Sequence, residues 1–124
     1  MELVGYEKLL DMEPKKLVGW LDDNFNDTVM SDIQTVEELD IAKCSLSMLT
    51  NKYSYLVSMA LFAKIAVREL KRKGKEFKEQ HEDMIDRRDV IEEMSKIVLQ
   101  QYNTISRMIT VKLEVNKELN MNMG

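Results

Sequence analysis

The chain has 124 residues, of which 44% are hydrophobic and 32% charged, and its formal net charge is −4. This length suits one domain with enough apolar side chains for a core, and the acidic balance argues against a dedicated basic coat for nucleic acid. Glycine and proline together number five, and residues that favour helices are common, so the composition predicts an all-α protein.

Cys44 is the single cysteine, so no disulfide can form within the chain, and a reducing cytoplasm fits best. We expect it to be either a small core thiol or a semi-buried one. Glu2 and Glu7 interrupt the start of the chain and argue against a signal peptide. The most apolar segment, residues 53–67, contains Lys64 and is shorter than the roughly 20 residues of a membrane span. We expect a cytoplasmic protein without a membrane partner.

The first predicted helix begins at Pro14, which suits the first helical position because its missing N–H costs nothing there. Its expected apolar face consists of Leu17, Val18, Trp20 and Leu21. Residues 22–24 are polar and end this helix, and a loop or short helical turn follows. Residues 1–34 are therefore expected to form an acidic N-terminal helical cap.

A capping box, Thr35 with Glu38, predicts the start of the next helix. Neither glycine nor proline then occurs before Gly74, where the helix either ends or runs on with lower stability. Apolar residues over this span follow steps of three and four: Leu39, Ala42, Leu46, Leu49, Tyr53, Leu56, Ala60, Ala63, Val67 and Leu70. This heptad spacing predicts one long helix packed against a partner helix. Serine and threonine residues between 45 and 51 allow a kink there.

A second apolar stripe on this helix consists of Val57, Leu61 and Ile65, and Met59, Phe62 and Ala66 widen it. A helix that is apolar on more than one face is buried by more than one neighbour. We expect the cap with Trp20 to cover part of this surface and a second subunit to cover the rest, which makes the protein a homo-oligomer.

Residues 75–85 are mostly polar, and Asp83 or Asp86 is the expected cap of a last helix from about Arg87 to Leu119. Its apolar face comprises Ile91, Met94, Val98, Tyr102, Ile105, Ile109 and Val115. The two long helices are predicted to form an antiparallel hairpin over residues 35–120, followed by a frayed tail at 121–124. The expected protein-interaction residues are Leu49, Tyr53, Leu56, Ala60, Ala63, Val67, Tyr102, Ile105 and Ile109.

Residues for catalysis are scarce. His81 is the only histidine, and the acids near it, Glu79, Glu82 and Asp83, are more typical of a solvated charged run than of a metal site. The four glycines are too scattered for a phosphate-binding loop. We therefore expect no enzymatic activity, no cofactor and no metal.

A basic island occupies residues 64–78, which hold seven bases and two acids, whereas residues 79–93 hold seven acids and two bases. Its cations are candidate contacts for the phosphates of single-stranded DNA: Lys64, Arg68, Lys71, Arg72, Lys73, Lys75 and Lys78. Arg87 and Arg88 are candidates to join them, and Phe77 is the one aromatic residue inside the island. The alternative is a solvated helix end, whose cations complement the helix dipole and pair with the acids that follow.

The segment NKYSYLVSMALFAKIAVRELKRKG, a polar connection and the segment DVIEEMSKIVLQQYNTISRMITVK resemble in layout the UvsY-type recombination mediators of phages. The resemblance covers about residues 51–115. It implies a helical, oligomeric accessory factor that helps to load a recombinase onto single-stranded DNA, with Lys71, Arg72, Lys73 and Lys75 as DNA contacts. It also implies the host cytoplasm as the location. The acidic N-terminal third and the acidic run over 79–93 depart from what DNA loading favours.

Two other functions compete with DNA binding. Residues 1–41 hold eleven acids and three bases, so an inhibitor or adaptor, such as an anti-defence protein, could bind a basic partner through them. The acidic face for this role comprises Asp22, Asp23, Asp27, Asp32, Glu37, Glu38 and Asp40. A structural assembly module needs only the heptads.

Overall fold

The computed structural model describes residues 5–26 and 32–123, with side chains described through residue 117. It contains, in chain order, α1 (Tyr6–Leu10), α2 (Pro14–Phe25), α3 (Val36–Lys73), the 3₁₀ helix η1 (Lys75–Phe77) and α4 (Lys78–Met123). No strand occurs within these described ranges, and the expected all-α class is confirmed.

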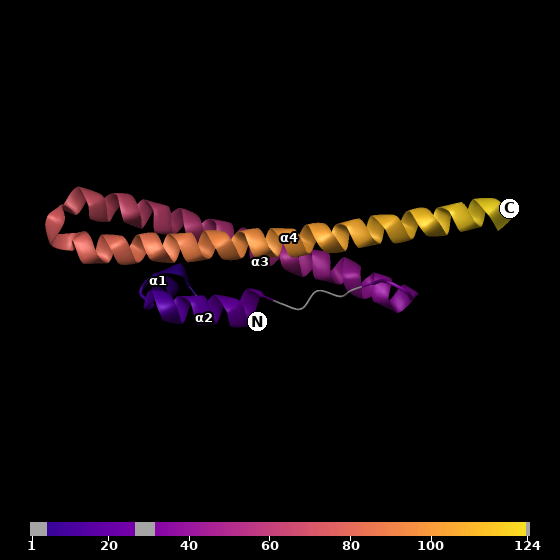
Figure 1. The fold of residues 1–124 in the computed structure, drawn as a ribbon, viewed down its shortest axis with the longest axis horizontal. Coiled ribbons are helices and arrows are strands. Elements are labelled where there is room, and N and C mark those ends of the chain that lie inside the picture. Colours follow the sequence, from indigo (N-terminus) through magenta and orange to yellow (C-terminus); the bar gives the residue numbers. More distant parts are fainter. Residues whose placement is uncertain (1–4, 27–31, 124) are drawn as a thin grey trace.

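The two long helices form the body of the molecule. Figure 1 shows α3 running to a tight turn and α4 returning along it in the opposite direction, with α4 extending past the start of α3. Helix α2 packs mainly on α4, and α1 contacts α3. The N-terminal helices therefore cover one side of the long pair over part of its length.

Helix α3 begins with the predicted capping box. The Thr35 hydroxyl accepts a hydrogen bond from the Glu38 amide at 3.0 Å and lies 3.3 Å from the Glu38 carboxylate. The helix is unbroken through residues 45–51, where the sequence allows a kink. Ser45 and Thr50 each donate their hydroxyl to the carbonyl four residues earlier, at 2.9 Å, so these polar groups are satisfied within the helix.

Gly74 ends α3 with φ +96° and ψ −169°, a backbone conformation that is essentially restricted to glycine. After the single turn of η1, α4 begins at Lys78, well before the Arg87 start expected from the sequence. Asp83 and Asp86 thus lie inside α4 rather than capping it. The run from 78 to 86 lacks an apolar period, yet its residues include many good helix formers and neither glycine nor proline.

Helix α4 also extends further than expected at its other end. It continues to Met123, so residues 121–123 of the predicted tail are helical, and Gly124 lies outside the described residues.

We call the buried apolar contact between α3 and α4 the seam. All ten heptad positions of α3 are buried or half-buried, as are the expected interaction residues of α4. The fully or almost fully buried members are Ala42, Leu49, Leu56, Ala60 and Ala63 of α3, and Ile91, Met94, Val98, Ile105 and Ile109 of α4. Of the nine residues predicted for protein interaction, all but Val67 lie in the hydrophobic core or pack against it.

The second apolar stripe of α3 remains largely exposed, unlike the seam. Val57, Leu61 and Ile65 remain 44%, 58% and 43% exposed, although Met59 is fully buried. The cap therefore covers only part of the apolar surface of α3, in line with the expectation that it could not cover all of it.

The cap contributes Leu9, Leu17, Leu21 and Phe25 to the core, each fully buried. The last three are spaced four residues apart and form the inner face of α2. Val18, predicted on that face, is 46% exposed because it lies at the edge of this row rather than within it. Trp20 is half-buried, as expected for a residue that covers the long helices.

Replacement by alanine is expected to change the free energy of unfolding in opposite directions at Gly74, which ends α3, and at Gly19, which lies inside α2. Gly74→Ala lowers the free energy of unfolding by about 1–3 kcal/mol, because alanine does not tolerate this backbone conformation. Gly19→Ala lies inside α2 with open space around the new methyl group, so it raises the same quantity by about 0.5–1 kcal/mol. Urea denaturation followed by circular dichroism measures both. A change of the same sign in both variants would contradict the backbone conformation at Gly74.

Two leucines on α3 test the seam. Leu56→Ala removes a fully buried side chain and is expected to cost about 2–5 kcal/mol of unfolding free energy. Leu61→Ala is the matched control, because Leu61 is 58% exposed and its loss should stay within about 0.5 kcal/mol. Thermal or urea unfolding compares the stability of the two variants. Similar losses of stability would contradict the burial of Leu56 in the seam.

Candidate nucleic-acid interface

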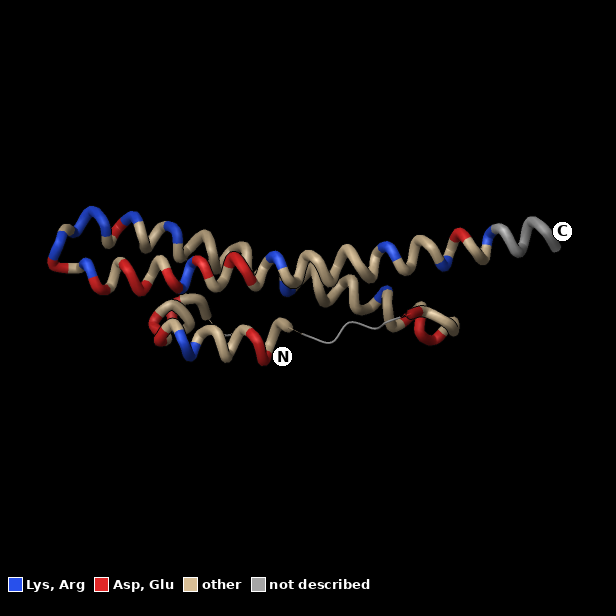
Figure 2. The backbone as a smooth tube through the Cα atoms, in the orientation of Figure 1, with Lys and Arg blue, Asp and Glu red and all other residues tan. Residues whose placement is uncertain are grey.

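The turn between α3 and α4 carries most of the predicted basic island. We call its exposed cations the basic tip: Arg68, Lys71, Arg72, Lys73, Lys75 and Lys78. Figure 2 shows Lys and Arg gathered where α3 meets α4, with Asp and Glu following along the first half of α4. The cations of the last turn of α3 lie at a helix C-terminus, where the helix dipole favours positive charge.

The tip cations make no ion pair with any carboxylate in the part of the chain that the structure describes. The ammonium group of Lys73 lies 5.4 Å from the centre of the Phe77 ring, in a cation–π contact. The sequence also allowed these cations to pair with the acids of residues 79–93. The six tip cations do not form such pairs in the described part of the chain. These charges are available to a ligand.

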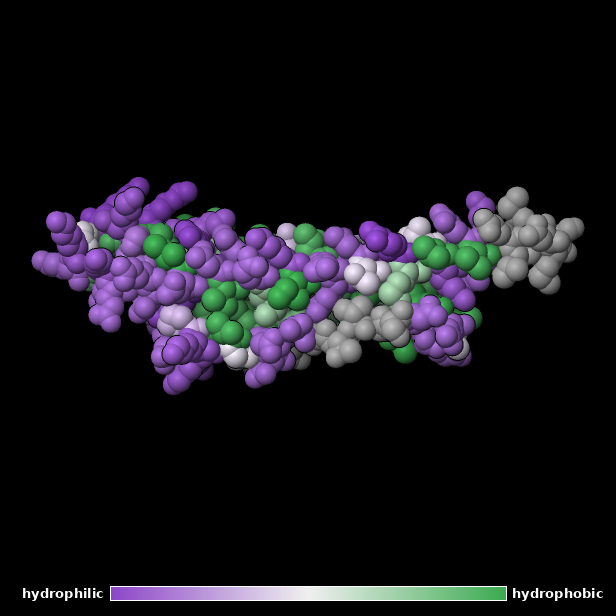
Figure 3. Space-filling view, in the orientation of Figure 1, coloured by the Kyte–Doolittle hydropathy of each residue, from purple (hydrophilic) through white to green (hydrophobic). Residues whose placement is uncertain are grey.

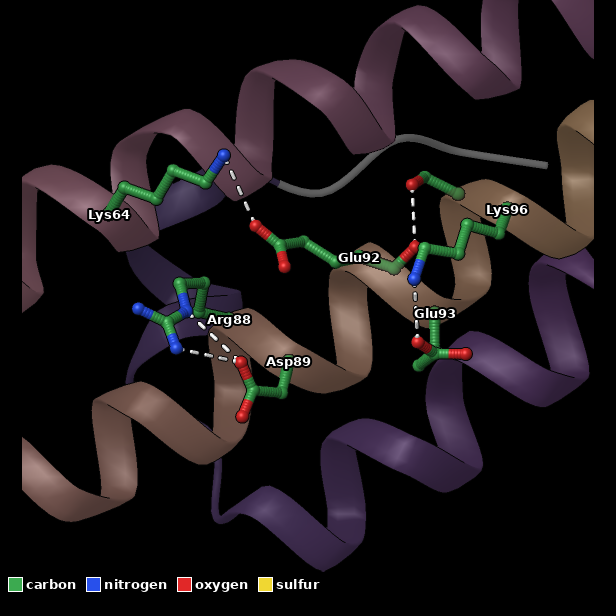
Figure 4. Close-up of polar contacts among 7 residues, drawn as sticks. Lys64, Arg88, Asp89, Glu92, Glu93 and Lys96 are labelled. Atoms are coloured by element: carbon green, nitrogen blue, oxygen red, sulfur yellow. Dashed lines mark hydrogen bonds and ion pairs between the residues drawn. The ribbon is translucent and has the colours of Figure 1, made fainter.

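Lys64 is the exception among the seven predicted contacts. Its ammonium group pairs with the Glu92 carboxylate at 3.2 Å, which links α3 to α4 (Figure 4). Both side chains are partly exposed, so the pair adds at most about 1 kcal/mol. Lys64 belongs to this contact between the helices rather than to the tip.

Arg87 and Arg88 also lie apart from the tip. Arg87 donates its Nε hydrogen to the Met12 carbonyl at 2.7 Å and so ties the loop between α1 and α2 to α4. Arg88 pairs with the neighbouring Asp89 at 2.9 Å (Figure 4). Both guanidinium groups have partners in the chain, which removes them from the candidate interface.

A shallow recess of about 210 Å³ lies at the turn. Its lining includes Leu70, Gly74 and three lysines, Lys71, Lys75 and Lys78. A phosphate group fits this volume, since a water molecule takes about 30 Å³. Lysine side chains from two helices and their connection thus line one small surface.

Tyr55 lies away from the tip in a group of aromatic rings. Its ring centre is 5.3 Å from that of Tyr6 and 5.7 Å from that of Phe25, which is stacked on it. Tyr6 also contacts Phe62 at 5.0 Å, so these rings join α1, α2 and α3. Burial raises the pKa of the Tyr55 phenol to about 12, and Tyr6 adds to the shift. This ring is not available to stack on a base.

Cys44 is exposed, which corrects the expectation of a core or semi-buried thiol. The residue falls between the heptad positions Ala42 and Leu46 and therefore points away from the seam. His81 is half-buried beside the recess. Within the described residues, no group of three or more His, Cys, Asp or Glu side chains is arranged to hold a metal ion.

The acidic face lies on other parts of the fold. Asp22 and Asp23 are near the end of α2, and Asp32, Glu37, Glu38 and Asp40 are around the start of α3, at the far end of that helix from the tip. All six except the half-buried Glu38 are exposed. Asp27 lies outside the described residues. Among the described helices, none is both long and apolar enough to cross a bilayer.

No family model matches the chain, and neither the curated proteins nor the solved structures compared with it contain a match. Function is therefore inferred from the chemistry of the surfaces described above.

The raised pKa of Tyr55 predicts a pH dependence. An unfolded phenol ionises at its ordinary value of 10.0, so the contribution of Tyr55 to stability is intact below pH 10 and is lost as the pH rises towards 12. An ultraviolet titration of phenolate absorbance is expected to contain a late step near pH 12 from Tyr55. Tyr55→Phe should remove that late step. A wild-type titration without it would contradict burial of this ring.

Proposed function

We propose that the protein is a non-enzymatic accessory factor that binds single-stranded DNA through the basic tip. The observation that carries this proposal is a set of six exposed cations without ion pairs to described carboxylates, on a chain whose net charge is −4. Cations that neutralise phosphates release the counterions condensed on the nucleic acid, and this release drives association.

The shape of the tip favours a single strand over a duplex. The cations surround a narrow turn between two helices, and a single strand can bend around such a convex end. Duplex DNA is stiff, with a persistence length of about 50 nm, so it would meet few of these cations at once. Phe77 is half-buried at the tip, and its ring is already in contact with Lys73.

We further propose that α3 and α4 form their antiparallel hairpin within one chain and that the protein works as a homo-oligomer. Exposed apolar side chains outside the seam, such as Val57 and Leu61, support self-association. An oligomer carries more than one tip, and a strand long enough to reach two of them would bind more tightly than it binds a single tip. The layout shared with UvsY-type mediators agrees with a role in phage recombination or replication, in the host cytoplasm.

A second candidate function is the binding of a basic partner protein through the acidic face. Asp23, Glu37 and Asp40 are exposed and make no ion pair with a described base. An inhibitor or adaptor of this kind would not need the tip.

The first experiment measures fluorescence anisotropy of a labelled single-stranded oligonucleotide with the wild-type protein. A tip that neutralises about four phosphates is expected to lose roughly 50-fold in affinity between about 50 and 200 mM salt. The tip variant Lys71→Glu, Arg72→Glu, Lys75→Glu should lose binding even at the lower salt concentration, while circular dichroism shows unchanged helicity.

The matched control is Lys8→Glu, Lys15→Glu, Lys16→Glu, which changes the net charge by the same amount at exposed positions of the cap. It should retain most of the binding. Equal losses of DNA affinity in the two variants would mean that binding depends on net charge and not on the tip. Absence of binding by the wild type would refute the DNA proposal and leave the acidic face as the candidate.

A further inference from the structure

The end of the molecule opposite the basic tip is open. Figure 1 shows the start of α3 lying apart from the C-terminal part of α4. An apolar groove of about 460 Å³ separates the segment before α3, which contributes Ile33, from the α4 residues Met108, Val111 and Val115. We call this region the open end.

The open end exposes apolar side chains on both helices. Ile109 is the last buried residue of α4 among those with described side chains, and beyond it Val111, Leu113 and Val115 are 53%, 46% and 44% exposed. On α3, Ile41 is 58% exposed. Figure 3 shows the apolar surface of α4 close to its C-terminal end. One chain alone therefore leaves these side chains in water, at a cost of about 25 cal/mol per Å².

The two arms of the open end carry opposite charges. The start of α3 presents the exposed acids Glu37 and Asp40. The end of α4 presents Arg107, the half-buried Lys112 and Lys117, which outnumber its exposed acid Glu114. None of these six side chains makes an ion pair among the described residues. Each chain thus offers one acidic arm and one basic arm, neither of which is neutralised by the other.

We propose that a second copy of this chain docks on the open end, with two-fold symmetry. In such an arrangement the acidic arm of each copy faces the basic arm of the other, so the same complementary contact forms twice. The apolar side chains of both arms are then buried between the copies. The occupant is a second copy because this charge pattern is its own complement.

The exposed stripe of Val57, Leu61 and Ile65 is a weaker candidate for this contact. Towards the turn it is followed along α3 by Arg68, Glu69 and Arg72, whose charges are mixed along one helix. Two separate arms of opposite charge, which the open end supplies, are missing there. The inference rests on the proposed self-association and names its surface.

Two charge-reversal variants test the docking. Arg107→Glu with Lys112→Glu makes both arms acidic, and Glu37→Lys with Asp40→Lys makes both arms basic. These positions avoid the Thr35–Glu38 capping box, so α3 keeps its start. Light scattering after size-exclusion chromatography is expected to give twice 14.5 kDa for the wild type and 14.5 kDa for each variant alone. An equimolar mixture of the two variants should regain the doubled mass, because unlike arms then face each other.

Lys15→Glu with Lys16→Glu is the control for net charge and should keep the wild-type mass. Val111→Asp, a single change at an exposed position, is a second route to the monomer if a double variant loses helicity in circular dichroism. A monomeric wild type would overturn self-association as a whole. A wild-type oligomer that survives both reversals, or a mixture that stays monomeric, would overturn docking at the open end. Anisotropy with single-stranded DNA tests the basic tip independently of either result.

Discussion

Burial of the seam sets the register of α3 against α4, and the positions of both ends of the molecule follow from it. The outermost buried residues of the seam are Ala63 and Ile91 towards the turn, and Ala42 and Ile109 towards the open end. Beyond these limits the two helices have no fully buried partner in the described part of the chain. The last turns of α3 are therefore free to carry cations into water, which creates the basic tip, while the far end stays apolar and unclosed.

The cap stabilises the middle of this long body. Aromatic rings from three helices meet there, with Phe25 stacked on Tyr55 and tilted against Trp20 at 5.6 Å. Such pairs add about 0.5–1.5 kcal/mol each beyond the area they bury. The hydrogen bond from Arg87 to the Met12 carbonyl holds the loop between α1 and α2 at the same place. The short N-terminal helices are thus fixed by a few strong contacts rather than by length.

Local patterns predicted much of the fold and less of the candidate interface. The heptads and the Thr35 capping box predicted the start and the course of α3, because each signal depends on neighbours in sequence. Gly74 indicated either its end or a weakened continuation, and the structure has the end there. The early start of α4 was missed because its first turns are polar on all sides. The density of cations around residue 71 predicted the tip. The pairing of Lys64 with Glu92, and of Arg87 with Met12, depends on how the helices align and has no signal in the local sequence.

The tight turn at Gly74 also bears on how the chain folds. Seam contacts near the turn join residues close in sequence, whereas those between Ala42 and Ile109 close a long loop. The entropy lost on closing a loop grows with its length, so the contacts nearest the turn are the least costly to form. Pairing of the two helices is favoured to begin at Gly74 and proceed outward, and such local contacts are typical of fast-folding helical proteins. By the same reasoning, the helices separate first at their free ends when the protein is heated or pulled.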